Sequence, residues 1–278
     1  MQKPFYALVL FLGIFLGCGE TSGNKQQGAE QTASPESVQT FLPATSKQAQ
    51  HGLELPYSYG NENIIEHMGY TLSYNERHRI PNWVAWELLS SELYGDFDRA
   101  EKFTPDPAWK GRQAYDSDYS GSGYDRGHMA PSGDMKWSSQ TMRECFYLTN
   151  VCPQHHNLNS GVWNDLEKQT RKEAKYYGTI WICCGPVIDR GKGTIGRNKV
   201  LIPDGFFKAL LARRKDGSYT SIGFYFPNEA GDLGLGRYAM SIDELEKLTG
   251  MDFFVNLDYA VQEKIEKTYD LWDWRIKK

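Results

Sequence analysis

The first residues suited to chemistry lie in the stretch YSGSGYDRGHMAPSGDM, residues 119–135. Arg126 and His128 occur here among glycines, with few residues that build a core. A neutral imidazole accepts a proton near working pH, and a guanidinium fork matches phosphate oxygens. We expect the glycines to form a turn in which both side chains face an anionic ligand, the alternative being a polar surface turn.

A second set of polar residues follows along a segment of helical character. Asn159, Trp163, Glu167 and Arg171 recur every four residues, so they drift only slowly around a helix surface. Asn159 offers a hard carbonyl oxygen of the kind that Mg²⁺ binds, and Arg171 a second fork for phosphate. The simpler alternatives are an N-cap role for Asn159 and a surface ion pair between Glu167 and Arg171.

Together the two sets suit phosphodiester hydrolysis. That reaction needs a base for water, a cation near the leaving oxygen, and donors for the charge that grows on the phosphate. His128, Asn159 and the two arginines offer these groups.

The remaining pattern predicts the elements that must position these groups. FYLTNV reads as a strand that ends near Asn150, and TIWICCGPVI as a buried strand. Asp216-Gly217 between two apolar runs indicates a hairpin, and Ser241 an N-cap. We therefore predict an α+β fold, a central antiparallel sheet with flanking helices. The expected helices cover 158–177, 241–247 and 258–269. Asn159 lies at the entrance of the first of these helices.

The N-terminal segment is typical of export. Residues 1–17 combine Lys3 with a short apolar run and predict a signal peptide. FLGC resembles a bacterial lipobox, which makes Cys18 the expected lipidated residue, the alternative being an ordinary signal peptide with an incidental cysteine. Residues 18–52 then form a flexible tether, and 53–278 the folded domain. The expected location is a bacterial cell envelope, on its periplasmic or cell-surface face, or else the secreted fraction.

The composition narrows the possible classes of protein. The chain is 40% hydrophobic with a net charge of −4, which excludes global disorder and an overall basic nucleic-acid binder, but not a local cationic cleft. The basic loop 189–199 either contacts a nucleic-acid backbone or is only solvated. The four cysteines of the domain either include one bridge between strands or are buried free thiols: Cys145, Cys152, Cys183 and Cys184.

Longer motifs identify a family. DRGHMAP and LTNVCPQHHNLNSGVWNDLEKQTR strongly resemble the DNA/RNA non-specific endonucleases, the secreted bacterial nucleases related to mitochondrial endonuclease G. The resemblance continues through GPVID, VLIPDGFFKALL and IDELEKLTGMDFF, and covers most of residues 80–257. It implies a ββα-metal (His-Me finger) core and metal-dependent cleavage of DNA, RNA or both, which leaves 5′-phosphates.

The resemblance also implies residue roles. His128 matches the general base, and Asn159 the sole protein ligand of a divalent cation, Mg²⁺ or alternatively Mn²⁺. Arg126 matches a residue beside the scissile phosphate. Glu167 matches a helix carboxylate that acts through metal-bound water, and Arg171 an arginine that stabilises the transition state.

Two further residues have supporting roles in this resemblance. Asn150 matches an asparagine that supports the hydrogen bonds of the active site, and Arg99 is the nearest candidate for a substrate-binding arginine, although its spacing aligns poorly. The alternative function is a catalytically inactive nuclease fold that binds nucleic acid or a protein partner. That alternative predicts the loss of a key residue, and the chain retains them all.

Overall fold

The computed structural model describes residues 52–58, 60–100, 102–231 and 233–277. The predicted signal peptide 1–17, Cys18 and the tether as far as residue 51 lie outside the described residues. Within the described part of the chain, every helix is too short or too polar to cross a membrane.

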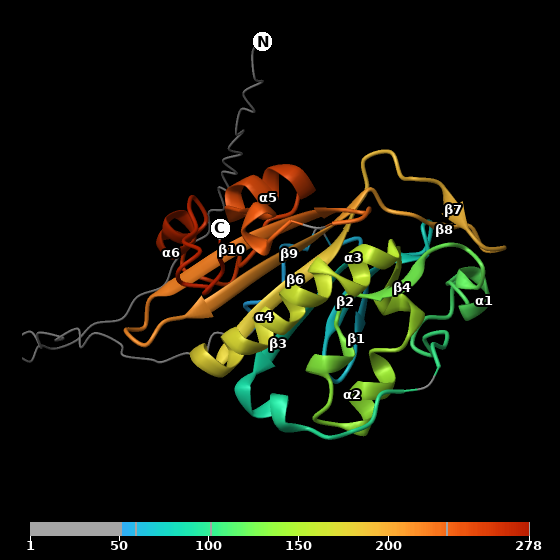
Figure 1. The fold of residues 1–278 in the computed structure, drawn as a ribbon, viewed down its shortest axis with the longest axis horizontal. Coiled ribbons are helices and arrows are strands. Elements are labelled where there is room, and N and C mark those ends of the chain that lie inside the picture. The colour runs from blue at the N-terminus through green and yellow to red at the C-terminus, as the bar shows by residue number, and fades with distance from the viewer. Residues whose placement is uncertain (1–51, 59, 101, 232, 278) are drawn as a thin grey trace, which may run out of the picture. The chain divides into compact units, whose positions relative to one another are not determined.

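A seven-stranded sheet lies at the centre of the domain, in the order β1-β2-β3-β6-β9-β10-β11, and all neighbouring strands are antiparallel (Figure 1). The predicted α+β class with a central antiparallel sheet is therefore confirmed. The strands are β1 (Asn63–Glu66), β2 (Thr71–Asn75), β3 (Ile80–Leu89), β6 (Thr179–Val187), β9 (Gly205–Arg213), β10 (Tyr219–Pro227) and β11 (Ala239–Met240).

The middle of the sheet follows directly from the sequence pattern. The apolar run TIWICCGPV forms β6, which lies between β3 and β9 and is buried along most of its length. β9 and β10 form the predicted hairpin, in which Gly217 adopts φ 88°, a left-handed conformation that favours glycine.

Shorter elements surround the sheet. The helices are α1 (Asp116–Tyr119), α2 (Ser139–Glu144), α3 (His156–Ser160), α4 (Val162–Tyr177), α5 (Ile242–Thr249) and α6 (Tyr259–Ile265). Two antiparallel ribbons pair β4 (Asp125–His128) with β5 (Val151–Gln154), and β7 (Thr194–Ile195) with β8 (Val200–Leu201). Single 3₁₀ turns cover η1 (Ser90–Tyr94), η2 (Ser132–Asp134), η3 (Leu148–Asn150) and η4 (Leu235–Arg237).

The sheet has a hydrophobic core on each face, because side chains alternate along its strands. On β3, Val84 and Trp86 join the core beneath α4, whereas Trp83 joins the core beneath α5 and α6. Figure 1 shows α4 across one face and α5 and α6 on the other. We call these the α4 face and the α5 face.

Three local predictions were wrong, and the expected helix 258–269 is shorter than predicted, because α6 ends at Ile265. FYLTNV is not a continuous strand, because Leu148–Asn150 form η3 and β5 begins only at Val151. The Asn150 side chain instead bonds backbone groups of other segments, which competes with a strand ladder. The glycine-rich DRGH segment, expected to be a turn, is the strand β4, whose Gly127 leaves room for Gln154: a Cβ there would lie 2.3 Å from Gln154 Oε1.

The third wrong prediction concerns the long helix. The expected helix 158–177 is two helices, α3 and α4, separated by Gly161 at φ −99°, ψ −118°. A Cβ on Gly161 would lie 2.3 Å from the Asn157 carbonyl oxygen, so the break requires glycine. Asn159 therefore belongs to the short helix before the break, on a different axis from Glu167.

The alternatives for the four cysteines are also settled. Cys145, Cys152, Cys183 and Cys184 are buried free thiols, and no disulfide occurs in the described part of the chain.

Candidate active site

A small polar cavity of about 180 Å³ gathers most of the residues that the sequence singled out. Five of them line it: Arg99, Arg126, His128, Asn159 and Glu167. Asn164, Pro131 and Ser132 complete the lining. Asn150 and Arg171 are not among the lining residues.

The β4–β5 ribbon and the two helices after it position these side chains. Arg126 and His128 are two residues apart on β4, and therefore project from the same side of that strand. Asn159 follows on α3, and Glu167 is on α4. The imidazole thus comes from the β4–β5 ribbon, and the amide and the carboxylate from the helices α3 and α4 that follow it, which is the ββα arrangement that the resemblance implied.

His128 occupies an aromatic niche at the cavity. It is 8% exposed, and its ring centroid lies 5.0 Å from that of Phe103 and 4.8 Å from that of Phe146. Burial, followed by the charge of Arg99, lowers the pKa of His128 to about 3. Its buried Nε2 has no hydrogen-bond partner among the described residues. At neutral pH the imidazole is therefore uncharged, as a proton acceptor must be.

Two arginines beside His128 have N–H groups that can bind an anion. Arg126 donates from Nε to Asp116 Oδ1 at 2.5 Å, and its guanidinium lies 5.5 Å from the Tyr119 ring centroid. Arg99 donates from Nη1 to Ser132 Oγ at 2.7 Å. Because a guanidinium has five N–H groups, these contacts orient each fork without using all of its donors. The structure thus places Arg99 at the cavity despite its poor alignment.

Asp125 fixes the amide of Asn159, a role that the sequence reasoning missed. Asn159 Nδ2 donates to Asp125 Oδ2 at 2.9 Å, and His156 Nδ1 lies 2.9 Å from the same oxygen. Because an ionised carboxylate only accepts, the amide nitrogen faces Asp125 and the carbonyl oxygen is left for another ligand. The available signal was the acidic residue directly before the arginine of DRGH.

Glu167 is a partly buried carboxylate with several cations near it. Burial raises the pKa of Glu167 to about 7, while the charges of Lys208, Arg171 and Arg99 act in the opposite direction. Lys208 is 1% exposed, and its Nζ lies 4.3 Å from the Trp163 ring centroid. Sequence reasoning missed Lys208 too, although a lysine inside the apolar strand GFFKALLAR was a visible signal.

Arg171 contacts a buried carboxylate behind the cavity. Its Nη1 donates to Asp134 Oδ1 at 2.8 Å, and Trp86 Nε1 donates to the other oxygen at 3.2 Å. Asp134 is 2% exposed, so burial raises its pKa, while Arg171 offsets that rise. Gly133 permits this approach, because a Cβ there would lie 2.7 Å from Arg171 Nη1.

Asn150 is fully buried and holds the segment after His128. Its Oδ1 accepts from the Ala130 backbone at 2.9 Å, and its Nδ2 donates to the carbonyl oxygens of Ala130 at 2.9 Å and Cys145 at 2.8 Å. Its backbone oxygen also accepts from Met129 at 3.0 Å. Asn150 therefore positions the end of β4, which fits the supporting role expected of it.

The residues at the cavity fit a hard divalent cation. The free amide oxygen of Asn159 and the carboxylate of Glu167 are the oxygen ligands that such ions prefer. Few protein ligands suit Mg²⁺ in particular, because that ion keeps several waters and also binds substrate phosphate.

The basic loop 189–199 lies near α1. The Asn198 amide donates to both oxygens of Asp118, at 3.1 and 2.9 Å. A contact between this loop and a nucleic-acid backbone remains a prediction.

Comparisons with known proteins show which family this chain resembles. A family model described as DNA/RNA non-specific endonuclease matches residues 51–260. Human mitochondrial nuclease EXOG is 39% identical over 68% of this chain, and human mitochondrial endonuclease G is 35% identical over 68%. A nuclease from Nostoc sp. is 37% identical over 72% of this chain and 76% of its own length.

The match to the relatives is partial in length. The chain covers 56% of human EXOG and 68% of human endonuclease G. The crystal structure of the EndoG/EndoGI complex contains a chain that superposes with a TM-score of 0.67 at 28% identity. That superposition covers 72% of this chain and 88% of the other.

Proposed function

Because the chain belongs to the DNA/RNA non-specific endonuclease family, we propose that it is a metal-dependent endonuclease that hydrolyses phosphodiester bonds of DNA, RNA or both. The observation that carries the proposal is the single cavity lined by Arg99, Arg126, His128, Asn159 and Glu167. Base, cation ligand and anion-binding groups thus lie within reach of one phosphate.

His128 acts as the general base. A ring nitrogen of the neutral imidazole takes a proton from water, whose oxygen then attacks phosphorus as the bond to the 3′ oxygen breaks. The leaving 3′ oxygen takes a proton from a solvent water, so the products are a 5′-phosphate and a 3′-hydroxyl, and His128 then releases its proton to solvent. A phosphate beside the ring raises the pKa of His128 from its low value in the free protein, because a nearby negative charge favours the imidazolium.

Arg99 and Arg126 bind the phosphate oxygens. Their remaining N–H groups donate to the charge that grows on the equatorial oxygens during attack. The contacts with Ser132 and Asp116 hold the two forks before substrate arrives, so less ordering accompanies binding.

Asn159 would hold the divalent cation, Mg²⁺ or alternatively Mn²⁺, as its one protein ligand, and Glu167 would act through a water bound to that ion. When bound, the ion would stabilise negative charge on the phosphate and on the leaving oxygen. Asp125 keeps the Asn159 oxygen directed at the ion by accepting from its amide nitrogen.

The test is cleavage of plasmid DNA and of single-stranded RNA by the full chain in Mg²⁺. Wild-type protein should cut at least one substrate, EDTA should abolish cutting, and His128→Ala should reduce the rate by about 10²–10⁴-fold. His78→Ala, which changes a histidine in the β2–β3 turn, is the matched control and should keep full activity. Wild-type protein that binds DNA without metal-dependent cleavage would instead support the inactive nuclease-fold alternative.

We also propose that the domain is anchored to a bacterial envelope through Cys18. The support is the apolar run that ends in FLGC, followed by a polar stretch. In bacteria that express the full chain and are fed an alkyne fatty acid, wild-type protein should incorporate the label. Cys18→Ala should not, and equal labelling of the two would refute the anchor.

A further inference from the structure

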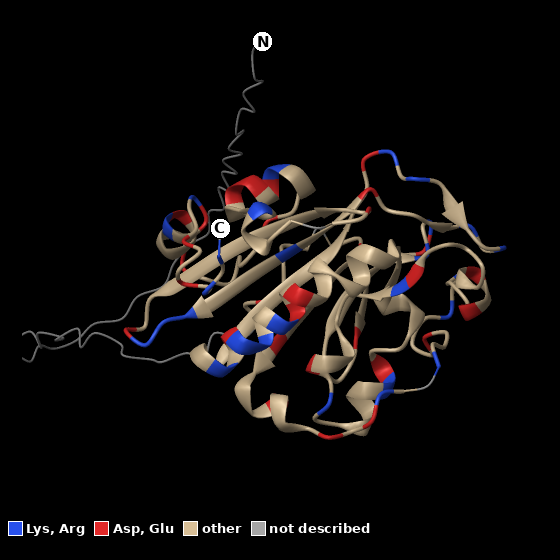
Figure 2. Ribbon diagram, viewed as in Figure 1, with Lys and Arg blue, Asp and Glu red and all other residues tan. Residues whose placement is uncertain are grey.

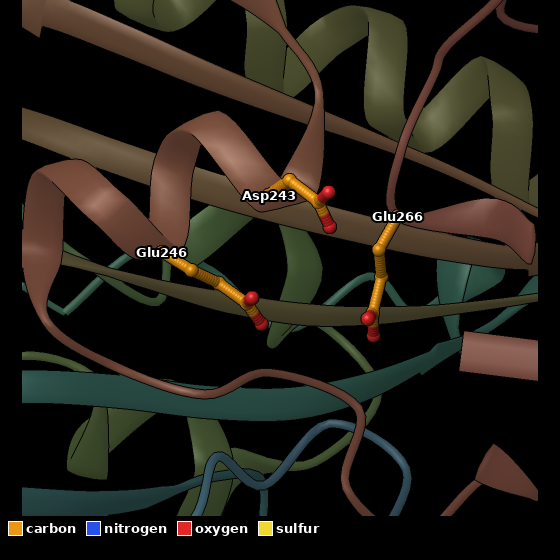
Figure 3. A group of neighbouring side chains, drawn as sticks. All are labelled: Asp243, Glu246 and Glu266. Atoms are coloured by element: carbon orange, nitrogen blue, oxygen red, sulfur yellow. The ribbon is translucent and has the colours of Figure 1, made fainter. Parts of the chain in front are cut away.

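Three carboxylates come together on the α5 face, far along the chain from the cavity residues. Asp243 and Glu246 are one turn apart on α5, and Glu266 follows the last residue of α6. One carboxylate oxygen from each lies within 4.8 Å of the others. Figure 3 shows the three side chains directed into the same space between the two helices.

Glu266 lacks the partner that a buried carboxylate requires. Its side chain belongs to a residue only 8% exposed, and its Oε1 makes no hydrogen bond with any described residue. An unsatisfied buried carboxylate is costly, and the cost is offset by a bound proton, by a paired positive charge or by a coordinated metal ion. The backbone of Glu266 is also fixed relative to α5, because the Asp243 backbone N–H donates to the Glu266 carbonyl oxygen at 3.0 Å.

The nearby charges are mostly of the same sign. Burial, followed by repulsion from Glu246, Asp252 and Asp243, raises the pKa of Glu266 to about 8. Burial also raises the pKa of Glu246 to about 7, and Lys247 offsets only part of that rise. Lys267, the next residue after Glu266, pairs instead with Glu263 at 2.6 Å.

We propose that Asp243, Glu246 and Glu266 bind a calcium ion, at a second metal site distinct from the cavity that holds Asn159. Three carboxylates supply up to six oxygens, and Ca²⁺ takes six to eight at flexible geometry. One oxygen of Glu246 already accepts from the Phe253 backbone at 2.9 Å, so the set is irregular. Irregular ligands disfavour Mg²⁺, which demands a near-octahedral shell.

The ion would connect the start of α5 to the end of α6. Both helices cover the α5 face, where Leu245 and Ile265 belong to one hydrophobic core. A calcium ion between them would stabilise the packing of this layer, independently of catalysis. This inference does not depend on the proposed nuclease activity.

Isothermal titration with CaCl₂ and with MgCl₂ tests the site. The protein is the full chain with Asn159→Ala, which removes the ligand in the cavity. We expect one Ca²⁺ per chain, bound more tightly than Mg²⁺, and a higher melting temperature in Ca²⁺ than in EDTA. Adding Glu266→Gln should lower calcium affinity by about tenfold or more, because ligand charge sets calcium affinity.

A second readout separates lost binding from lost folding. In EDTA, Glu266→Gln should melt at the same temperature as its parent or higher, because the change removes repulsion among the carboxylates. Glu263→Gln, which neutralises an exposed glutamate of the same helix, should bind calcium like the parent. If Asn159→Ala does not fold, the chain with Asn159 intact should lose one of its calcium sites on Glu266→Gln.

The proposal is overturned if calcium binding is absent, if Glu266→Gln binds calcium as well as its parent, or if Mg²⁺ binds as tightly as Ca²⁺.

Discussion

Glu167, which is partly buried, and Glu266, which is buried, are carboxylates on opposite faces of the central sheet, and the charges around them differ. Burial raises the pKa of both, to about 7 for Glu167 and about 8 for Glu266. Around Glu167 the charges of Lys208, Arg171 and Arg99 lower the pKa and only that of Asp134 raises it, whereas the nearby carboxylates all raise the pKa of Glu266. Burial alone therefore does not distinguish the sites, but the sign of the surroundings does.

The difference makes a net charge of −4 compatible with the polyanionic substrate proposed for this chain. Cations lie beside the cavity on the α4 face, while the acidic cluster, in which only Glu266 is buried, is on the α5 face. Figure 2 shows acidic and basic residues distributed over the whole domain, so the net charge says little about either site. Local fields at short range decide which ligand each face favours.

The largest expected effect follows from removing Arg171. Arg171→Met leaves Asp134 buried without its partner, and breaking such a pair costs about 3–5 kcal/mol of unfolding free energy. Urea denaturation at pH 7 measures the loss. Glu266→Gln, the corresponding change on the α5 face, should have the opposite sign in EDTA.

A double variant shows which role of Arg171 matters. Adding Asp134→Asn to Arg171→Met should restore much of the stability, because the orphaned charge is gone. If cleavage recovers along with stability, Arg171 acts only as a structural partner. If cleavage stays low in the folded double variant, the guanidinium also acts on the phosphate. An unchanged stability in the single variant would refute the charge balance described for the α4 face.

Asp125→Asn should have an effect of intermediate size, and it tests the hydrogen bond that orients the Asn159 amide in the cavity. Without an obligate acceptor, the Asn159 amide can turn its nitrogen towards the metal, and such supporting changes cost about 10–100-fold in metal affinity or activity. The rate of DNA cleavage against Mg²⁺ concentration provides the measurement. Asp165→Asn, an exposed aspartate on α4, is the control and should match wild type.

His128 on the α4 face and Glu266 on the α5 face should also respond to pH in opposite directions. The pKa of His128 is lower in the folded protein than its ordinary 6.5, so the unfolded chain binds more protons as pH falls below 6.5. Stability is then lost by up to about 1.4 kcal/mol per pH unit until pH approaches 3. The pKa of Glu266 is raised from 4.5, so its contribution is lost as pH rises towards 8.

Melting temperatures between pH 4 and 9 in EDTA measure the loss of stability both towards acid pH and towards alkaline pH. His128→Asn should make the melting temperature depend less on pH on the acid side, and Glu266→Gln should do the same on the alkaline side. A profile in which each variant parallels wild type would show that neither group titrates as described.

The smallest effects are expected for exposed pairs on both faces. Lys168→Ala on α4 and Lys267→Ala beyond α6 each remove a solvent-exposed ion pair, and such pairs contribute little. Neither change should move the urea midpoint measurably. A clear shift from either would mean that surface charge, and not only buried charge, distinguishes the faces.

Local sequence patterns predicted much of the fold for identifiable reasons. TIWICCGPV is apolar throughout and formed a buried strand, and Asp216-Gly217 supplied the residue that a left-handed turn requires. Ser241 capped α5 through its hydroxyl and a capping box with Glu244. These signals depend on residues that are neighbours in the chain, so periodicity and propensity suffice to find them.

The wrong predictions share one cause. Asn150 left the strand ladder because its amide bonds Ala130, and DRGH became a strand because β5 lies beside it. The helix break at Gly161 depended on contact with the Asn157 carbonyl oxygen. Each outcome depended on tertiary or close backbone contacts that residue periodicity does not encode.

The sequence by itself determined the chemical groups of the cavity, because DRGH and the segment from Asn159 to Arg171 supply base, amide, carboxylate and guanidinium. Only the tertiary structure decided which of them meet. It assigned Arg171 to Asp134, Asp125 to Asn159, and Lys208 to the vicinity of Glu167. The physical reason is that charge pairing acts over a few ångströms of space, and packing brings together residues that are far apart in the chain.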